Sequence, residues 1–520
     1  MFRYCINIQL FILLFCFFSC TKDVKNEKQK DDIIPQIEEK TNVLLIIADD
    51  LNCDLGTYGN LIVKSPNIDL LAERGILFEN AHNQYPLCGP SRASFMTSMY
   101  TNQTKITRNN MNLRNSVPDV ITLGQRFRQQ GYQSVRIGKM FHYDNPSAIG
   151  TSGNDDIYSW DQTINPYGRD KIEEYKINTL SPRKYGGTLS WLASDGKDEE
   201  QTDGIAASEA IKKLNEFAKS GTPFFLAVGF FRPHTPFVAP KKYFDLYDRE
   251  KIEIPKNPSN YLATLPEPAV KSIRAKKNQL DLKKELAQEI KEAYYSTISF
   301  VDAQVGRILD NLKANGLDKN TVVVFTSDHG FHMGEHGHWQ KQTLFENSTR
   351  IPLIIYAPHF ENKGTKSMSP VELIDLYPTL MDLTNINTPP HVVGKSLTPI
   401  MKNINASVRE SALTRWRNGY SIKTRRYRLT KWGQNGELGY ELYDHKNDKN
   451  ELVNLASHKD YNEVMDSLKL MIEKRINDAS NKPEGIGRQI ENAKSMYKAK
   501  NITFGDIHEI NGEIIYSKKK

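Results

Sequence analysis

Short, continuous apolar runs recur along the chain and alternate with longer stretches in which apolar residues follow helical spacing. A run without polar alternation is typical of a strand buried on both faces of a parallel sheet. The runs lie at residues 42–48, 134–137, 223–230, 321–326 and 351–356, and the helical stretches at 204–219, 282–314 and 371–383. This order of strands and helices predicts an α/β fold with a mostly parallel sheet.

The pattern changes after about residue 398. Residues 409–432 are basic, aromatic and rich in strand-forming types, and residues 440–444 (YELYD) are a further short strand candidate. Residues 456–480 carry apolar side chains at helical spacing and predict a helix. We therefore expect a large α/β domain at residues 41–398, a smaller α+β subdomain at 399–485 and a lysine-rich tail at 486–520.

The first twenty residues have the pattern of an export signal. Arg3 precedes an apolar run that ends at Phe18, which is shorter than the roughly 20 residues of a membrane-spanning helix. The following Ser19-Cys20 resembles the lipobox of bacterial lipoproteins, and the polar residues after it predict a tether. We expect residues 1–19 to be a signal peptide, Cys20 to carry lipid and residues 20–40 to be a tether; a plain signal peptide cut nearby is the alternative. The protein is then an exported bacterial lipoprotein, in the periplasm or at the outer membrane and cell surface.

Composition excludes several classes of protein. The chain has 520 residues and five cysteines. Cys5, Cys16 and Cys20 lie within the first twenty residues, which leaves too few cysteines for a disulfide scaffold or for a cysteine-rich zinc or iron–sulfur site. The formal net charge of +7, from 69 basic and 62 acidic residues, is too small to indicate nucleic acid, and we expect no such partner.

Ionisable residues follow two of the predicted strands directly. Asp49-Asp50 comes after the first strand, and Ser327-Asp328-His329 follows the strand at 321–326. In open α/β sheets, ligands bind at this carboxyl edge. Three carboxylates and one imidazole that converge there suit Ca²⁺ or Mg²⁺ rather than Zn²⁺, although either acidic pair alone is equally typical of a loop.

The sequence Cys88-Gly89-Pro90-Ser91-Arg92 places a cysteine where a helix is expected to begin. Proline suits the first turn of a helix, and residues 91–99 are able to continue it. Backbone N–H groups at a helix N-terminus attract anions, and Arg92 adds a cation suited to an oxyanion. The alternatives are that Cys88 is a small buried hydrophobe or pairs with Cys53.

The pattern Cys-x-Pro-Ser-Arg resembles the signature of the type I sulfatases, which are relatives of alkaline phosphatase. Further motifs of that family follow in order over residues 42–456, and their spacing most resembles iduronate-2-sulfatase-like bacterial polysaccharide sulfatases. These motifs are Gly138-Lys139-Met140-Phe141-His142, Arg232-Pro233-His234-Thr235-Pro236, Ser327-Asp328-His329-Gly330, Gly334-Glu335-His336-Gly337-His338-Trp339-Gln340-Lys341, residues 376–383, and Glu441-Leu442-Tyr443-Asp444.

The resemblance implies an alkaline-phosphatase-like fold, in which helices sandwich a mostly parallel sheet. It also implies that a formylglycine-generating or anaerobic sulfatase-maturing enzyme oxidises Cys88 to formylglycine. The implied ligands of one Ca²⁺, or less readily Mg²⁺, are Asp49, Asp50, Asp328, His329 and the modified Cys88. The hydrated aldehyde offers the hard oxygen that a thiol lacks.

The resemblance further assigns a role to each catalytic candidate. The hydrated formylglycine attacks sulfur and displaces the alcohol, and its collapse to the aldehyde then expels sulfate. Arg92, Lys139 and Lys341 hold the sulfate group. His142 is the base for the collapse, and His234 is the acid that protonates the leaving alcohol.

The resulting expectation is a sulfatase that acts on sulfated carbohydrate, such as ulvan or glycosaminoglycan fragments. A phosphodiesterase or phosphonate monoester hydrolase of the same superfamily is one alternative, and a non-catalytic glycan-binding lipoprotein is another. We expect substrate subsites in residues 145–198 and 241–277. Candidate contacts are Trp160, Tyr167, Arg169, Lys184 and Trp191, while His332, His336 and His338 are interpreted as loop polar residues and Cys53 as structural.

Overall fold

The computed structural model describes residues 40–182, 184–493, 507–510 and 513–516. The last two ranges are strands β18 (Ile507–Ile510) and β19 (Glu513–Tyr516), which pair with each other antiparallel. The predicted signal peptide, the lipid-bearing Cys20 and nearly all of the tether lie outside the described residues. Within the described part of the chain, no helix has the length and apolar character needed to cross a membrane.

An eight-stranded sheet forms the centre of the large domain and confirms the predicted α/β class. Its strand order is β12-β2-β11-β10-β1-β8-β4-β5. The parallel core comprises β1 (Asn42–Asp49), β10 (Thr321–Ser327), β8 (Phe224–Pro233), β4 (Gln133–Gly138) and β5 (Gln162–Ile164). On the other edge, β11 (Leu353–Tyr356) runs antiparallel to β10 and to β2 (Ile76–Phe78), and β12 (Thr365–Ser367) completes the sheet.

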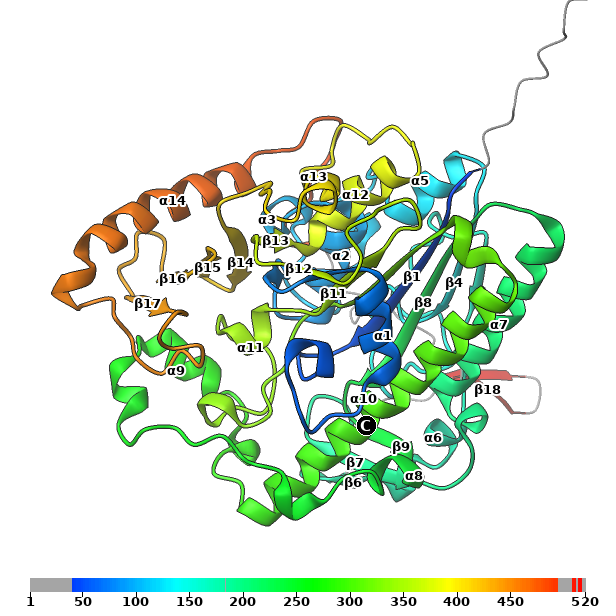
Figure 1. Cartoon of the computed structure of the whole chain (residues 1–520). Coiled ribbons are helices and arrows are strands. Elements are labelled where there is room, and N and C mark those ends of the chain that lie inside the picture. Colours follow the sequence, from blue (N-terminus) through cyan, green and yellow to red (C-terminus); the bar gives the residue numbers. More distant parts are fainter. Residues whose placement is uncertain (1–39, 183, 494–506, 511–512, 517–520) are drawn as a thin grey trace, which may run out of the picture. The chain divides into compact units, whose positions relative to one another are not determined.

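Helices cover both faces of this sheet (Figure 1). In β1, Leu44 and Ile46 pack into one apolar cluster and Val43, Leu45 and Ile47 into another, as the alternation of strand side chains requires. The first cluster includes residues of α1 (Pro66–Arg74), α7 (Thr202–Ser220) and α10 (Lys284–Ala314). The second includes residues of α2 (Cys88–Thr97), α5 (Leu123–Gln129) and α12 (Leu376–Leu383). Because both faces are covered, β1 and β8 are buried throughout.

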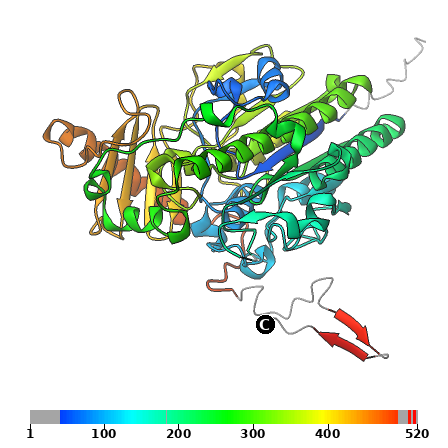
Figure 2. The same cartoon turned by 90° about the horizontal axis from the view of Figure 1, so that it is seen from below.

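A second, antiparallel sheet follows in the C-terminal part of the chain, in the order β14-β15-β16-β17 (Figure 2). Its strands are β14 (Ala412–Trp416), β15 (Gly419–Lys423), β16 (Tyr427–Trp432) and β17 (Tyr440–Asp444), and α14 (Asn462–Ser480) packs against it. A buried ion-pair network joins this region to the large domain. Arg409 pairs with Glu372 and Asp375, and Arg475 Nη2 lies 2.6 Å from Glu372 Oε1.

The smaller elements connect these layers. They are β3 (Ala81–His82), α3 (Thr101–Thr104), α4 (Leu113–Ser116), α6 (Arg169–Ile172), β6 (Asn178–Thr179), β7 (Ser190–Ser194), β9 (Phe237–Pro240), α8 (Lys241–Phe244), α9 (Glu267–Ile273), α11 (Glu346–Thr349), β13 (Val371–Glu372) and α13 (Thr398–Lys402). The strands β6, β7 and β9 form a small sheet of their own.

Two predicted helices begin a full turn or more later than their hydrophobic spacing indicated. Residues 371–372 form β13, which pairs with β3, so the helix predicted at 371–383 begins only at Leu376. Glu372 in that strand forms ion pairs with Arg409 and Arg475. These contacts, together with the pairing of β13 with β3, favour the extended backbone there. The helix predicted at 456–480 begins at Asn462, because Leu455 and Ala456 pack against the antiparallel sheet as part of the preceding turn.

Candidate active site

The two acidic strand ends meet at one edge of the sheet, as their sequence positions predicted. β1 and β10 are parallel neighbours, with Ala48 opposite Ser327. The Asp50 amide donates a hydrogen bond to Asp328 Oδ1 at 3.2 Å, and the Leu51 amide donates one to Ser327 Oγ at 3.0 Å. These bonds hold Asp50 in a left-handed backbone conformation with φ of 63°, which is uncommon for a residue other than glycine. The chain therefore turns sharply where the acidic pair stands.

Cys88 occupies the first residue of α2, directly after its N-cap residue Leu87. The helix ends at Thr97, two residues earlier than the sequence suggested, because Ser98 adopts a left-handed conformation. The sulfur lies 3.2 Å from His329 Nε2, 3.3 Å from Lys341 Nζ and 3.8 Å from Asp50 Oδ1. Burial and the nearby Asp49 carboxylate raise the pKa of the Cys88 thiol well above its usual value. An unmodified Cys88 is therefore a neutral thiol that cannot act as a strong nucleophile.

Cys53 and Cys88 are both free, so the alternative in which they pair as a disulfide is wrong. Cys53 is half-buried, and burial raises the pKa of its thiol to about 12. A thiol with such a pKa is unreactive at neutral pH, which agrees with the structural interpretation of Cys53.

Four buried residues present potential metal-ligand atoms to one another. The side chains of Asp49, Asp50, Cys88 and His329 each place one such atom within 4.8 Å of all the others. Asp50 Oδ2 is buried without a hydrogen-bond partner, and burial raises the pKa of this carboxyl group. A cation would compensate this unpaired oxygen, and hard carboxylate oxygens are ligands for Ca²⁺ or Mg²⁺. The residues therefore fit the cation that the resemblance implies.

His329 belongs to this group, whereas the predicted ligand Asp328 lies beside it and is held by hydrogen bonds. Asp328 Oδ1 accepts hydrogen bonds from the amides of Asp50 and His329, and its Oδ2 accepts one from Arg92 Nε at 2.8 Å. His329 Nδ1 lies 3.0 Å from the carbonyl oxygen of Gly330. A proton on Nδ1 satisfies that carbonyl and leaves the lone pair of Nε2 facing the cluster, as is usual for a metal-binding histidine.

The three predicted cations all reach the carboxylates of the cluster. Lys139 Nζ lies 2.5 Å from Asp49 Oδ2, and Lys341 Nζ lies 2.5 Å from Asp50 Oδ1. Arg92 Nη2 lies 3.2 Å from Asp49 Oδ1, and Arg92 Nη1 donates to the carbonyl oxygens of Lys139 and Met140. Burial alone would raise the pKa of Asp49, but Lys139, His234 and Arg92 hold it well below its usual value. The site is thus a compact set of charges that nearly balance.

The two predicted acid–base histidines follow neighbouring strands, β4 and β8. His142 Nε2 lies 3.6 Å from Asp144 Oδ1, and burial lowers the pKa of His142 to about 4. His234 Nδ1 lies 2.6 Å from the carbonyl oxygen of Thr235, and its Nε2 lies 3.7 Å from Asp50 Oδ2. Burial and Lys341 lower the pKa of His234. Both rings are therefore neutral near pH 7, and His234 holds its single proton on Nδ1, away from Asp50.

A cavity of about 610 Å³ opens onto three of these residues, His142, His234 and Lys341. Loops from both predicted subsite segments line it. Its other lining residues are Leu87, Asn109, Asp144, Asn145, Pro146, Ser147, Lys171, Glu174, Tyr185, Gly186, Gly187, Lys276, Gln340 and Gln342. The sequence analysis did not identify these residues, because nothing in a lysine- and asparagine-rich loop distinguishes the residues that face the cavity.

None of the five candidate substrate contacts named from the sequence lines the cavity. Trp160 and Trp191 are buried, and their indole N–H groups donate to Asp155 and Glu289. Arg169 forms an ion pair with Glu173. These side chains stabilise the loops rather than face the opening.

His332, His336 and His338 lie in the loop between β10 and α11, and none of them lines the cavity, but all three are buried. His336 stacks on Phe345 with ring centroids 4.0 Å apart, and its Nδ1 lies 2.5 Å from the Tyr261 hydroxyl. His332 packs edge-on against both other histidines. The three rings form an aromatic support beneath the turn that carries Lys341.

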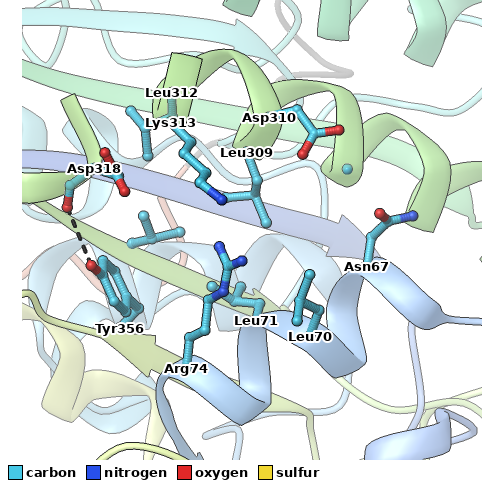
Figure 3. Close-up of a pocket in the computed structure, with 12 residues that line it drawn as sticks. Asn67, Leu70, Leu71, Arg74, Leu309, Asp310, Leu312, Lys313, Asp318 and Tyr356 are labelled. Atoms are coloured by element: carbon cyan, nitrogen blue, oxygen red, sulfur yellow. Dashed lines mark hydrogen bonds between the residues drawn. The ribbon is translucent and has the colours of Figure 1, made fainter. Parts of the chain in front are cut away.

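A separate hollow of about 60 Å³ lies between α1 and α10 (Figure 3). Arg74, Asp310 and Lys313 are among its lining residues, and the Tyr356 hydroxyl donates to the carbonyl oxygen of Asp318 at 3.3 Å. None of the predicted site residues lines it. It is a surface dimple between two helices and is separate from the acidic cluster.

The sequence profile of the sulfatase family, described as Sulfatase, matches residues 41–386. This chain belongs to the sulfatase family. A second profile, described as N-sulphoglucosamine sulphohydrolase, C-terminal, matches residues 334–478. The match to the sulfatase profile covers every predicted site residue of the chain. The chain is therefore a sulfuric ester hydrolase.

Individual relatives agree with this assignment. A protein named Sulfatase from Formosa agariphila is 34% identical over 484 residues, covering 89% of this chain and 91% of the relative. Iduronate 2-sulfatase from Homo sapiens is 33% identical over 390 residues, covering 67% of this chain and 70% of the relative. Among solved structures, the phosphonate monoester hydrolase SpPMH from Silicibacter pomeroyi superposes with a TM-score of 0.71 at 22% identity, covering 84% of this chain and 96% of that one. That structural likeness confirms the fold.

Proposed function

We propose that this sulfatase hydrolyses sulfate esters of carbohydrates, with Cys88 converted to formylglycine as its nucleophile. The observation that carries the proposal is the position of Cys88, at a helix N-terminus and within 4 Å of His329, Lys341 and Asp50. As a thiol, Cys88 is neutral and buried, and it offers no hard oxygen to a cation. The hydrated aldehyde of formylglycine supplies a nucleophilic oxygen at this position.

We further propose that Asp49, Asp50, Asp328, His329 and the modified Cys88 hold one Ca²⁺, with Mg²⁺ as the weaker candidate. The bound cation supplies positive charge that favours an ionised oxygen and neutralises a sulfate oxygen. Arg92 fixes the orientation of Asp49 and Asp328 through its ion pairs. Lys341 reaches both the cluster and the cavity, so it is placed to bind the sulfate group.

His142 and His234 act at the cavity side of the site. Nδ1 of His142 has no hydrogen-bond partner among the described residues, Nε2 lies 3.6 Å from Asp144 Oδ1, and a pKa of about 4 leaves the ring neutral near pH 7. This leaves a basic nitrogen free to accept a proton from the modified Cys88 side chain. His234 must first gain a proton at Nε2 before it can donate to the leaving alcohol, because its Nδ1 faces the Thr235 carbonyl.

The maturation step is tested by mass. Peptide mapping of protein from its own host should show a loss of about 18 Da at Cys88, whereas ordinary cysteine oxidation adds mass. Sulfate release from defined sulfated oligosaccharides, together with its loss in Cys88→Ala, tests the activity. An unmodified Cys88 in protein from the native host would contradict the proposal, and glycan binding without turnover would favour the non-catalytic alternative.

A phosphonate monoester hydrolase is the second candidate, because the fold is shared with SpPMH. Paired aryl sulfate and aryl phosphonate esters, tested on the same matured protein, separate the two. A higher kcat/KM for the phosphonate would favour the second candidate.

We also propose that residues 1–19 direct export, that Cys20 carries lipid and that residues 20–40 tether the enzyme to the membrane. The polar composition of the tether and the apolar run before Cys20 support this assignment. The full-length protein should partition with membranes, and Cys20→Ser should shift it to the soluble fraction. Equal partitioning of both forms would contradict the lipid anchor.

A further inference from the structure

The lysines that line the cavity differ in whether a nearby carboxylate neutralises their charge. Lys171 Nζ is paired with Glu174, and Lys341 Nζ lies 2.5 Å from Asp50 Oδ1. Lys276 has no carboxylate partner among residues 40–182 and 184–493; its amino group donates to the carbonyl oxygen of Gly187 at 2.9 Å. Burial and the neighbouring charges of Lys341 and Lys184 lower the pKa of Lys276. Lys276 is thus a half-buried cation that lines the same cavity as Lys171 and Lys341.

The segment that carries Lys276 is held firmly in place. Asn278 Nδ2 donates to Ser181 Oγ at 2.9 Å and to Thr188 Oγ1 at 3.1 Å. Together with the Lys276–Gly187 bond, these contacts lock the segment after α9 onto the loop before β7. Fixed cations lose less side-chain entropy on binding than mobile ones, so this arrangement suits recognition of an anion.

His338 connects this segment to the reaction centre. Its Nδ1 lies 2.9 Å from the carbonyl oxygen of Ile273, at the end of α9, and its Nε2 lies 2.9 Å from the carbonyl oxygen of Lys341. A neutral imidazole has one N–H, so the ring donates to one of these carbonyl groups and packs against the other, and it lies between the Lys276 segment and Lys341. Two cations on one rigid frame define the separation of two anionic groups on a single ligand.

We infer that Lys276 forms a second anion subsite, which binds a carboxylate or a second sulfate group on the same carbohydrate whose sulfate ester reaches Lys341. This inference rests on the proposed function and narrows it to substrates with at least two anionic groups. A cavity of about 610 Å³ is large enough for a ligand of roughly disaccharide size. The Lys276 ammonium group has three N–H donors, and those that do not bond to the Gly187 carbonyl are available to such an anion.

The test compares Lys276→Gln with Lys277→Gln in the Cys88-modified enzyme. Lys277 is the exposed neighbour and does not line the cavity, so its variant is the matched control. The probes are a monosulfated uronate disaccharide, its carboxyl-reduced form, and a disulfated disaccharide without a carboxylate. Loss of one charge-assisted hydrogen bond predicts that Lys276→Gln raises KM about tenfold to a hundredfold for a probe that uses the subsite.

The probes separate the sources of the anion. A KM increase for the uronate disaccharide that disappears after carboxyl reduction assigns the subsite to a carboxylate, and an increase confined to the disulfated probe assigns it to sulfate. Equal changes for all three probes, or no change, would overturn the subsite while leaving the sulfatase assignment intact. Failure of the modified wild type to release sulfate from any probe or from an aryl sulfate would overturn the proposed function and the subsite with it.

Discussion

Lys341 Nζ lies 3.3 Å from Cys88 Sγ, although 253 positions separate the two residues in the chain. The same amino group lies 2.5 Å from Asp50 Oδ1, so one lysine contacts both Cys88, the proposed nucleophile, and the acidic group proposed to hold a cation. Its neighbours Asp50 and Cys88 outweigh burial and raise the pKa of Lys341, which keeps it charged. Lys341 therefore places a positive charge where the cavity meets the acidic cluster.

Lys341→Met should therefore reduce kcat by about a hundredfold to a thousandfold, the usual cost of losing one preorganised charge at a reacting group. The measurement is steady-state sulfate release by protein whose Cys88 conversion has been verified by mass. Lys277→Met serves as the control, because it removes an exposed lysine. A variant that retains more than half of the wild-type kcat would show that Lys341 does not contact the reacting sulfate.

Ca²⁺ should stabilise the protein as well as support activity. Bound cation compensates the unpaired Asp50 Oδ2, so saturating Ca²⁺ should raise the unfolding free energy by about 3 kcal/mol at a hundredfold excess over Kd. Calorimetry with and without chelator measures this, with Mg²⁺ giving a smaller shift.

Asp50→Asn should abolish the Ca²⁺-dependent shift, whereas Asp245→Asn, which changes an exposed acid at the end of α8, should retain it. An identical shift in both variants would place the stabilising cation elsewhere.

The parts of the site that the sequence predicted share a local signature. Asp49 directly follows an apolar run and Asp328 directly follows the strand at 321–327, and parallel pairing of those strands brings their ends together. Cys88 precedes a proline that marks the first turn of a helix. In these cases the short-range pattern and the tertiary fold agree, so local reasoning succeeds.

The missed features depend on contacts between distant segments. His338 is buried because two carbonyl groups, from Ile273 and Lys341, converge on its ring, and no spacing in the sequence records that meeting. Lys276 stands in a lysine-rich stretch, so its inward position follows from the loop contacts alone. Strand pairing with β3 likewise overrode the helical spacing at residues 371–372.

The junction between the two sheets should be sensitive to loss of Arg409. Its guanidinium pairs with Glu372 and Asp375, and all three side chains are buried. Arg409→Met leaves Asp375 without its ion-pair partner, so we expect a loss of about 3–5 kcal/mol in unfolding free energy. Urea unfolding measures the loss, and Arg417→Met, at an exposed arginine in the turn between β14 and β15, is the control. Equal stability of the two variants would show that the network contributes nothing net.

Glu441 should make the stability of the folded chain depend on pH. Its Oε1 accepts a hydrogen bond from Trp432 Nε1 at 2.6 Å, its Oε2 accepts one from the Tyr443 hydroxyl at 2.7 Å, and burial raises its pKa from 4.5 to about 7. Between these two values the folded chain keeps a proton that the unfolded chain releases. The contribution of Glu441 to the unfolding free energy is therefore fully present below pH 4.5. It falls by roughly 3 kcal/mol in total as the pH rises to about 7.

Glu441→Gln carries no such proton, so the unfolding free energy of the wild type minus that of the variant should decrease between about pH 5 and about pH 8. The difference is the appropriate readout, because other buried carboxyl groups such as Asp302, with a pKa raised by burial to about 6, titrate in the same range. Glu463→Gln changes an exposed acid of α14 and serves as the control. The unfolding free energy of the wild type minus that of this variant should stay constant between about pH 5 and about pH 8. A wild-type advantage over Glu441→Gln that grows with pH would mean that Glu441 is ionised in the folded protein, with Trp432 and Tyr443 stabilising its charge.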